Sequence, residues 1–131
     1  MKQIIANLAI VVRDYDEAIR FYTDVLNFDL IEDTPLSEVK RWVRVRPNGA
    51  GEDGTCLLLA KAKNAEEEKA IGYQSGGRVF LFIHTDDFER DYKRLVKHKV
   101  EIIRGPVVES HGKVCVFLDL YGNKWDLIEP A

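Results

Sequence analysis

The polar side chains with the clearest chemical potential lie on segments that otherwise read as apolar strands. Residues 4–12 alternate in polarity, and Asn7 falls on the face opposite the aliphatic one. Residues 78–85 alternate in the same way, with Arg78 and His84 opposite the aliphatic side. A polar group on such a face needs water, a ligand or another polar group as its partner. This face is therefore where the sequence predicts a functional site.

The two cysteines offer less chemistry. Cys56 and Cys115 are far apart in the sequence and form no Cys-x-x-Cys motif, so we expect a pair of buried or half-buried intracellular thiols. A nucleophilic Cys115 would need a base, and no histidine lies at a useful spacing from it. A nucleotide site is also not expected, because Gly76 and Gly77 precede a strand and not a helix.

These residues are expected to be positioned by an order of strands and helices that occurs twice in the chain. Each half is predicted to run strand, helix, strand and then two further strands, which makes a βαβββ module. The expected strands are 4–12, 28–32, 41–46, 55–60, 78–85, 100–104, 113–118 and 124–128, and the expected helices are 16–26, 64–71 and 87–98. The predicted fold class is α+β: two tandem βαβββ modules forming a curved mixed sheet around a concave cavity, with helices on the outer face. We expect a single domain, residues 1–131, with module one at 1–62, a connector at 63–76 and module two at 77–131.

Both module helices carry a sequence signal for their first turn. Asp14 is followed three residues later by Glu17, which is the spacing of a capping box. Asp86 and Glu89 repeat that spacing at the start of the second helix. Asn27 is expected to end the first helix in a left-handed conformation.

Composition excludes several classes of partner. The formal net charge is −3, which argues against a nucleic-acid or anionic-membrane partner, because either would favour a basic face. No apolar run approaches the ~20 residues that a membrane-spanning helix needs. The N-terminal residues lead straight into a strand, so no signal peptide is expected and the predicted location is cytoplasmic.

Two segments carry a family resemblance. Residues 16–28 read Asp-Glu-Ala-Ile-Arg-Phe-Tyr-Thr-Asp-Val-Leu-Asn-Phe, and residues 119–129 read Asp-Leu-Tyr-Gly-Asn-Lys-Trp-Asp-Leu-Ile-Glu. The first resembles the opening signature, and the second the last hairpin, of the vicinal oxygen chelate superfamily, which includes glyoxalase I, bleomycin-resistance proteins and extradiol dioxygenases. The resemblance implies the two-module fold, a small-molecule ligand and a homodimer, and it leaves the reaction open.

The resemblance also implies a metal site that this chain does not complete. Enzymes of the superfamily hold a divalent metal with His, Glu, His and Glu from the first, fourth, fifth and eighth strands. In this sequence those places fall on Asn7, Leu58, Arg78 and Asp126, of which only Asp126 is a competent ligand. A catalytic zinc site needs about three protein ligands. We therefore expect no cofactor. The alternative is a divalent metal such as zinc, nickel, manganese or iron, held by Asp126, His84 and His111.

What replaces the metal is suggestive. Because they occupy places whose side chains would converge on one ion, Arg78 and Asp126 are expected to form an ion pair. Either the two charges only neutralise each other, or Arg78 offers its donor fork to a carboxylate, phosphate or enol oxygen of a ligand. Phe80 and Phe82 are also the kind of residues that fill the core of a small sheet, and for these two the core interpretation is favoured. The full set of expected ligand-binding residues is Arg78, Asp126, Asn7, Trp42, Arg44, Cys56, Leu58, Gln74, Phe80 and Phe82.

Two functions remain open from the sequence. The favoured one is a metal-independent small-molecule binding protein of the glyoxalase/bleomycin-resistance type, with an apolar and aromatic cavity anchored by an arginine. The alternative is a glyoxalase-like lyase, isomerase or dioxygenase that uses a non-standard set of metal ligands.

Overall fold

A computed structural model describes residues 2–131 of the chain and divides it into two compact units. Unit 1 ends at Ile71, and unit 2 comprises Gly72–Ala131. Each unit contains one four-stranded mixed sheet and repeats the βαβββ order. The expected α+β class with two such modules is confirmed. No helix within residues 2–131 combines the length and the apolar character needed to span a membrane.

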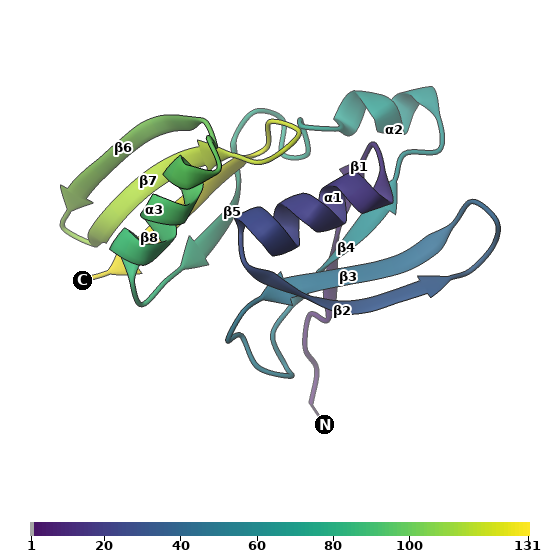
Figure 1. The fold of residues 1–131 in the computed structure, drawn as a ribbon, viewed down its shortest axis with the longest axis horizontal. Coiled ribbons are helices and arrows are strands. Elements are labelled where there is room, and N and C mark those ends of the chain that lie inside the picture. The colour runs from purple at the N-terminus through teal and green to yellow at the C-terminus, as the bar shows by residue number, and fades with distance from the viewer. Residues whose placement is uncertain (1) are drawn as a thin grey trace. The chain divides into compact units, whose positions relative to one another are not determined.

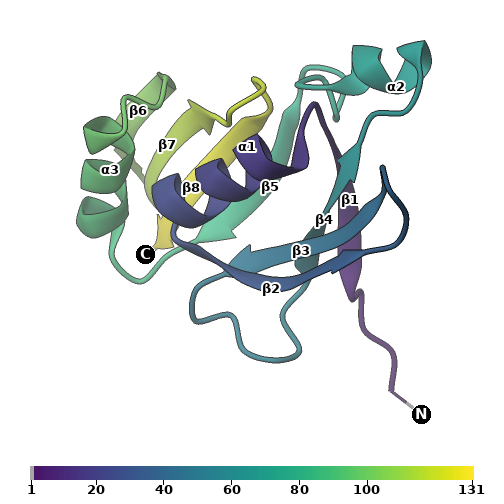
Figure 2. The ribbon, with the colours of Figure 1, turned by 45° about the vertical axis from the view of Figure 1, so that its right-hand side comes forward.

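Unit 1 is a sheet with one main helix on its surface. The strand order is β1-β4-β3-β2, in which β1 runs parallel to β4 and the other neighbours are antiparallel. Figure 1 shows α1 lying along one face of the sheet, and Figure 2 shows β2 and β3 as a long twisted ribbon. The elements are β1 (Asn7–Val12), α1 (Tyr15–Arg20), η1 (Phe21–Val25, a π-helical turn), β2 (Phe28–Pro35), β3 (Arg41–Pro47), β4 (Cys56–Lys61) and α2 (Ala65–Ala70).

The first helix begins and ends where its sequence signals predict. The Asp14 carboxylate accepts a hydrogen bond from the backbone N–H of Glu17 at 2.9 Å, so Asp14 is the N-cap. The carboxylate of Glu17 is bound by the guanidinium of Arg13, at 2.7 Å in the shorter contact. Asn27 follows the helix with φ of 60°, which confirms the expected left-handed end.

The face of the unit 1 sheet that packs against α1 forms the core of the unit. Arg41 marks this face, because its guanidinium lies 5.1 Å from the ring centroid of Tyr15 on α1 and pairs with Asp16 of the same helix. Alternate strand residues on this side are buried with side chains from α1 and η1: Ile10, Val12, Val43, Val45, Leu57, Leu59, Tyr15, Ala18 and Tyr22. The intervening strand residues point the other way and form what we call the helix-distal face of unit 1.

Unit 2 repeats the arrangement. Its strand order is β5-β8-β7-β6, with β5 parallel to β8, and α3 covers one face (Figure 1). One irregularity affects the candidate site: the register between β5 and β8 shifts between Val79 and Leu81, which leaves Phe80 as an extra residue. The elements are β5 (Val79–His84), α3 (Phe88–Lys97), β6 (Ile102–Glu109), β7 (Gly112–Leu118) and β8 (Lys124–Pro130).

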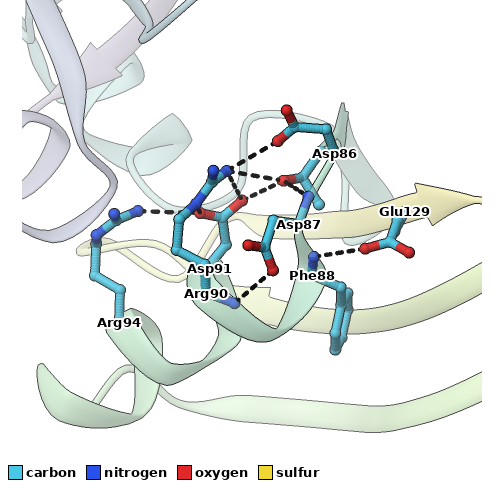
Figure 3. Close-up of polar contacts among 8 residues, drawn as sticks. Asp86, Asp87, Phe88, Arg90, Asp91, Arg94 and Glu129 are labelled. Atoms are coloured by element: carbon cyan, nitrogen blue, oxygen red, sulfur yellow. Dashed lines mark hydrogen bonds and ion pairs between the residues drawn. The ribbon is translucent and has the colours of Figure 1, made fainter.

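The start of α3 differs from the expectation. Asp87, and not Asp86, is the N-cap, because its carboxylate accepts a hydrogen bond from the backbone N–H of Arg90 at 3.1 Å (Figure 3). Asp86 instead pairs with the Arg90 guanidinium at 3.2 Å, and Asp91 binds both Arg90 and Arg94. Both aspartates are favourable N-cap residues, but only Asp86 has a glutamate three residues later, so the capping-box spacing pointed to Asp86 whereas the backbone geometry selects Asp87.

Glu129 shows which face of the unit 2 sheet meets α3. Its carboxylate accepts a hydrogen bond of 2.8 Å from the backbone N–H of Phe88 at the start of the helix (Figure 3). Trp125 and Leu127 share the parity of Glu129 on β8 and are buried on the same side. Asp126 and Ile128 therefore lie on the helix-distal face of unit 2.

Candidate functional site

The helix-distal face of unit 1 collects five of the expected site residues on three neighbouring strands. Asn7 on β1 is the register partner of Cys56 on β4, and Leu58 on β4 is the partner of Arg44 on β3. Trp42 lies two residues before Arg44 and shares its side of β3. The structure therefore places Asn7, Trp42, Arg44, Cys56 and Leu58 on one face.

Arg44 is held in place on this face by two contacts. Its Nε donates to Glu32 Oε1 at 3.1 Å, and its Nη1 donates to the sulfur of Cys56 at 3.4 Å. The Arg44 side chain is 25% exposed, so most of it is covered while part still reaches solvent. A guanidinium carries five N–H donors, and these two contacts leave others for a further acceptor. Glu32 was not among the expected site residues.

Asn7 contributes a polar atom that lacks a partner. Its Oδ1 is buried and makes no hydrogen bond. Most buried polar atoms in folded proteins are hydrogen-bonded, so an exception needs an explanation such as a missing ligand. Asn7 lies beside Cys56, which contacts Arg44, so this acceptor and the guanidinium belong to one patch.

Asp126 is the corresponding exception in unit 2. One of its carboxylate oxygens is buried and makes no hydrogen bond. Burial raises the pKa of this carboxyl group above its usual value, an effect opposed by the positive charges of Arg104 and His111 and reinforced by Glu109. Its register partner on β5 is Phe82, whose side chain is one of the more exposed apolar groups of the chain at 63%. The half-buried carboxylate of Asp126 and the exposed ring of Phe82 therefore lie side by side.

Arg104, the cation that most lowers the pKa of Asp126, lies two strands away from it and does not pair with it. Arg104 on β6 is opposite Val116 on β7, and Val116 is opposite Asp126 on β8. Two strand spacings separate the outer backbones by about 10 Å. The Arg104 guanidinium binds Glu109 instead, and His111 Nε2 lies 3.4 Å from the other oxygen of Glu109. Glu109 therefore has two basic neighbours, Arg104 and His111, whereas Asp126 pairs with neither of them.

The expected ion pair between Arg78 and Asp126 is not formed. Arg78 precedes β5 and is exposed, and the register places Asp126 opposite Phe82, four residues further along. No ion pair within residues 2–131 joins the two side chains. In the first-strand register, Leu58 is opposite Ala9 and Asp126 is opposite Phe82, so Arg78 does not occupy the place next to Asp126 that the resemblance implied.

Two further expected residues have mainly backbone roles in the structure. Gln74 lies in the segment before β5, where its N–H donates to the Asn123 side chain at 3.0 Å. Phe80 is the bulged residue of β5 and is half-buried. Neither is placed next to Asp126 by the strand register.

The residues present do not fit the metal that the superfamily's enzymes use. Leu58 has no donor atom, Arg78 is a permanent cation, and Asn7 and Asp126 each supply a single unpartnered oxygen. The alternative set also fails to gather: within residues 2–131 no three His, Cys, Asp or Glu side chains are placed to hold an ion, so Asp126, His84 and His111 do not form a site. No chemical step is therefore assigned to a metal.

Both cysteines are buried free thiols. Burial, and secondly the charge of Asp126, raises the pKa of the Cys115 thiol to about 11. A thiol with that pKa is almost entirely protonated at neutral pH, so Cys115 is a core residue and not a nucleophile.

Two polar residues near Asp126, Arg104 and Glu109, were not among the expected site residues. His111 was expected only as an alternative metal ligand, and in the structure it lies against Glu109. The expected strand stopped at Arg104, whereas β6 continues to Glu109. The signal that could have found Arg104 is the repeat itself, because the position matching Arg104 in unit 1 is Glu32, which is also charged.

Two βαβββ units, each with a helix on one sheet face and polar residues among apolar ones on the other, define a class of two-module ligand-binding and catalytic folds. The chain belongs to the Glyoxalase/Bleomycin resistance protein/Dioxygenase superfamily, whose sequence profile matches residues 4–127. The resemblance expected from the two terminal motifs is thereby confirmed.

The relatives extend over nearly the whole chain. An uncharacterized protein of Shewanella frigidimarina is 54% identical over 130 residues, which covers 98% of this chain and 95% of that protein. The solved structure of TnmS3, an antibiotic binding protein from Streptomyces sp. CB03234, is 28% identical with a TM-score of 0.77 and covers 100% of this chain and 98% of its own. A glyoxalase/bleomycin resistance protein from the same Streptomyces strain is 29% identical with a TM-score of 0.72, covering 95% and 98%.

Proposed function

We propose that this protein binds a small organic molecule of the antibiotic type without a metal ion, and that Arg44, in place of Arg78, is the arginine that anchors the ligand on unit 1. The observation that carries the proposal is the pairing of a partly covered guanidinium with the buried, unpartnered Oδ1 of Asn7 on one face. Together they suit a ligand that offers a carbonyl or carboxylate oxygen to the guanidinium and an enol O–H to Asn7 Oδ1. The antibiotic-binding role of a relative 28% identical over the full chain supports the ligand class.

The metal-free part of the proposal rests on donor chemistry. Asn7, Leu58, Arg78 and Asp126 offer at most two oxygen ligands where about three protein ligands are needed. Elemental mass spectrometry of the purified protein should find no stoichiometric zinc, nickel, manganese or iron. Addition of these ions should not raise the melting temperature by several degrees, because only binding to the folded state stabilises. A stoichiometric metal would contradict the proposal and direct attention to enzyme assays.

Ligand binding is tested by thermal shift with a panel of aromatic natural-product antibiotics in the presence of a chelator. For any compound that stabilises the protein, Arg44→Ala should weaken binding roughly tenfold, since a charge-assisted hydrogen bond is lost. Arg78→Ala is the matched control and should leave the affinity unchanged, because that side chain is exposed and outside the patch. An equal loss of ligand affinity in both variants, or no loss in either, would show that Arg44 does not anchor the ligand. Light scattering on the same samples tests the expected homodimer.

A further inference from the structure

The helix-distal face of unit 2 carries a carboxylate without an ion-pair partner. Lys124, two residues before Asp126 on the same side of β8, donates its Nζ to the carbonyl of Gly77 at 2.8 Å and forms no ion pair with Asp126. Arg104 and Glu109 bind each other, and His111 also lies against Glu109, so the Asp126 carboxylate on this face forms no ion pair with any of residues 2–131. One Asp126 oxygen is buried and makes no hydrogen bond. An ionised, partly covered carboxylate gains most from a positively charged hydrogen-bond donor.

An aromatic ring stands next to this carboxylate. Phe82 is the register partner of Asp126 across the parallel β5–β8 pair, and its side chain is 63% exposed. Side chains that are opposite each other on adjacent strands have Cβ atoms about 5 Å apart. A cation seated on Asp126 therefore also lies within the ~6 Å at which a ring face attracts a cation.

Apolar side chains surround the pair. Ile128 lies two residues along β8 from Asp126, and Val114 and Val116 lie on the adjacent strand β7 with the same side-chain direction. All three are at most 8% exposed, so they pack as a buried aliphatic layer beside the carboxylate, and the exposed apolar surface of the site is the ring of Phe82. Such a combination suits an apolar or aromatic molecule that carries a single basic nitrogen.

We infer that the helix-distal face of unit 2 is a subsite for a protonated amine on a small organic molecule, with Asp126 as its hydrogen-bond acceptor and Phe82 as its cation–π partner. This inference rests on the proposed small-molecule binding function and adds the charge of the ligand. It assigns each unit, considered by itself, a different chemistry: in unit 1 the Arg44 guanidinium donates to a ligand oxygen and Asn7 Oδ1 accepts from a ligand N–H or O–H, while in unit 2 Asp126 and Phe82 bind an ammonium group.

The experiment uses two probes of the same skeleton, 1-naphthylmethylamine and 1-naphthylmethanol, titrated into the full-length isotopically labelled protein near neutral pH. Backbone amide shifts of β5 and β8 report binding at the subsite. The amine should bind at least tenfold more tightly than the alcohol. Asp126→Asn, which keeps the shape and removes the charge, should abolish this preference. Phe82→Leu should weaken amine binding about threefold and leave alcohol binding almost unchanged.

Asp86→Asn is the matched control, because Asp86 is an aspartate of the same unit whose side chain is 90% exposed. It should leave the preference for the amine intact. Equal binding of both probes, an amine preference that survives Asp126→Asn, or no binding of the amine at β5 and β8 would each overturn the inference. Failure here with an intact Arg44 effect would leave the proposed function standing, whereas loss of the Arg44 effect alone would leave the amine subsite standing.

Discussion

The two units carry opposite charge arrangements at matching places in their sheets. In unit 1 the residues opposite one another across three strands are Glu32, Arg44 and Leu58, and in unit 2 they are Arg104, Val116 and Asp126. We call these the unit 1 rung and the unit 2 rung. In the unit 1 rung the opposite charges are on adjacent strands and bind at 3.1 Å. In the unit 2 rung a valine separates them, and the carboxylate stays unpaired.

This difference shows that the effect of a carboxylate on stability depends on which groups surround it. Unit 2 itself supplies the contrast. Asp119, seven residues before Asp126, is buried and accepts hydrogen bonds from five donors: four in the turn between β7 and β8, and the indole N–H of Trp125. Donors stabilise a buried carboxylate, and their absence makes it costly. We therefore expect the two aspartates to respond to substitution with opposite signs.

The largest effect should come from Asp119→Ala. It leaves the N–H groups of Tyr121, Gly122 and Asn123 and the indole N–H of Trp125 without their acceptor, so the free energy of unfolding should fall by about 3 kcal/mol. Urea denaturation measures it. Asp53→Ala, in the exposed loop between β3 and β4 where Asp53 pairs only with Lys2, is the control and should change stability by less than about 0.5 kcal/mol. Similar losses in both variants would mean that the five donors contribute little.

Asp126→Leu should instead stabilise the protein, since it copies Leu58 of the unit 1 rung into the unit 2 rung. Removing a partly covered, unpaired carboxylate should raise the free energy of unfolding by about 1 kcal/mol near pH 7, a figure reduced for the group's solvent contact. Comparing chemical denaturation of this variant and the wild type measures the gain.

The gain from Asp126→Leu should depend on pH in a defined direction. Burial raises the pKa of Asp126 in the folded state, with Arg104, His111 and Glu109 as the other charges that act on it. The folded protein therefore holds this proton more tightly than the unfolded chain, and wild-type stability is lost as the pH rises through the folded-state pKa. The advantage of the leucine variant should be full near pH 7, should shrink as the pH falls through the raised folded-state pKa of Asp126, and should be smallest below the usual aspartate pKa of 3.8. A gain that grows on acidification would contradict this account.

A smaller effect is expected when a cation is added beside Asp126. Phe82→Lys places an ammonium group at the register partner of the carboxylate, where it supplies the neighbour that the unit 2 rung lacks. Because position 82 is exposed, the stability gain should be only about 0.5 kcal/mol. The pKa of Asp126, followed by NMR of its side-chain carboxyl carbon, should fall. Phe82→Gln removes the ring without adding charge and should not lower this pKa.

The sequence predicted the elements well and their pairing less well, for a physical reason. Strand and helix periodicity is local, so both modules, the Asp14 cap and the Asn27 terminus were all found from it. Register is not local. A single bulge at Phe80 shifts the pairing of the residues before it by one position. The partner of Asp126 is Phe82, so Arg78 is four residues away along β5.

The candidate-site residues show the same difference between local pattern and strand register. Alternation alone placed Asn7, Trp42, Arg44, Cys56 and Leu58 on one face, because unit 1 has no bulge in β1, and the β3–β4 pairing is continuous from Val43 to Val45. The partners of Arg44 and Arg104, which are Glu32 and Glu109, depend on pairings across register shifts in β2 and β6. Neither partner follows from the order of residues along the chain.

The smallest change in stability should come from Glu32→Gln, which leaves Arg44 without its counter-charge. The two side chains are 36% and 25% exposed, so solvent screens the pair and the loss should be a few tenths of a kcal/mol. Its effect on binding should be larger, because the guanidinium is released toward any anionic ligand oxygen. Binding of 1-naphthoate should tighten several-fold in this variant, and Glu32→Gln combined with Arg44→Ala should remove the gain. Unchanged binding would mean that Glu32 positions Arg44 without competing for it, and the contrast between the two rungs would then be one of geometry and not of charge.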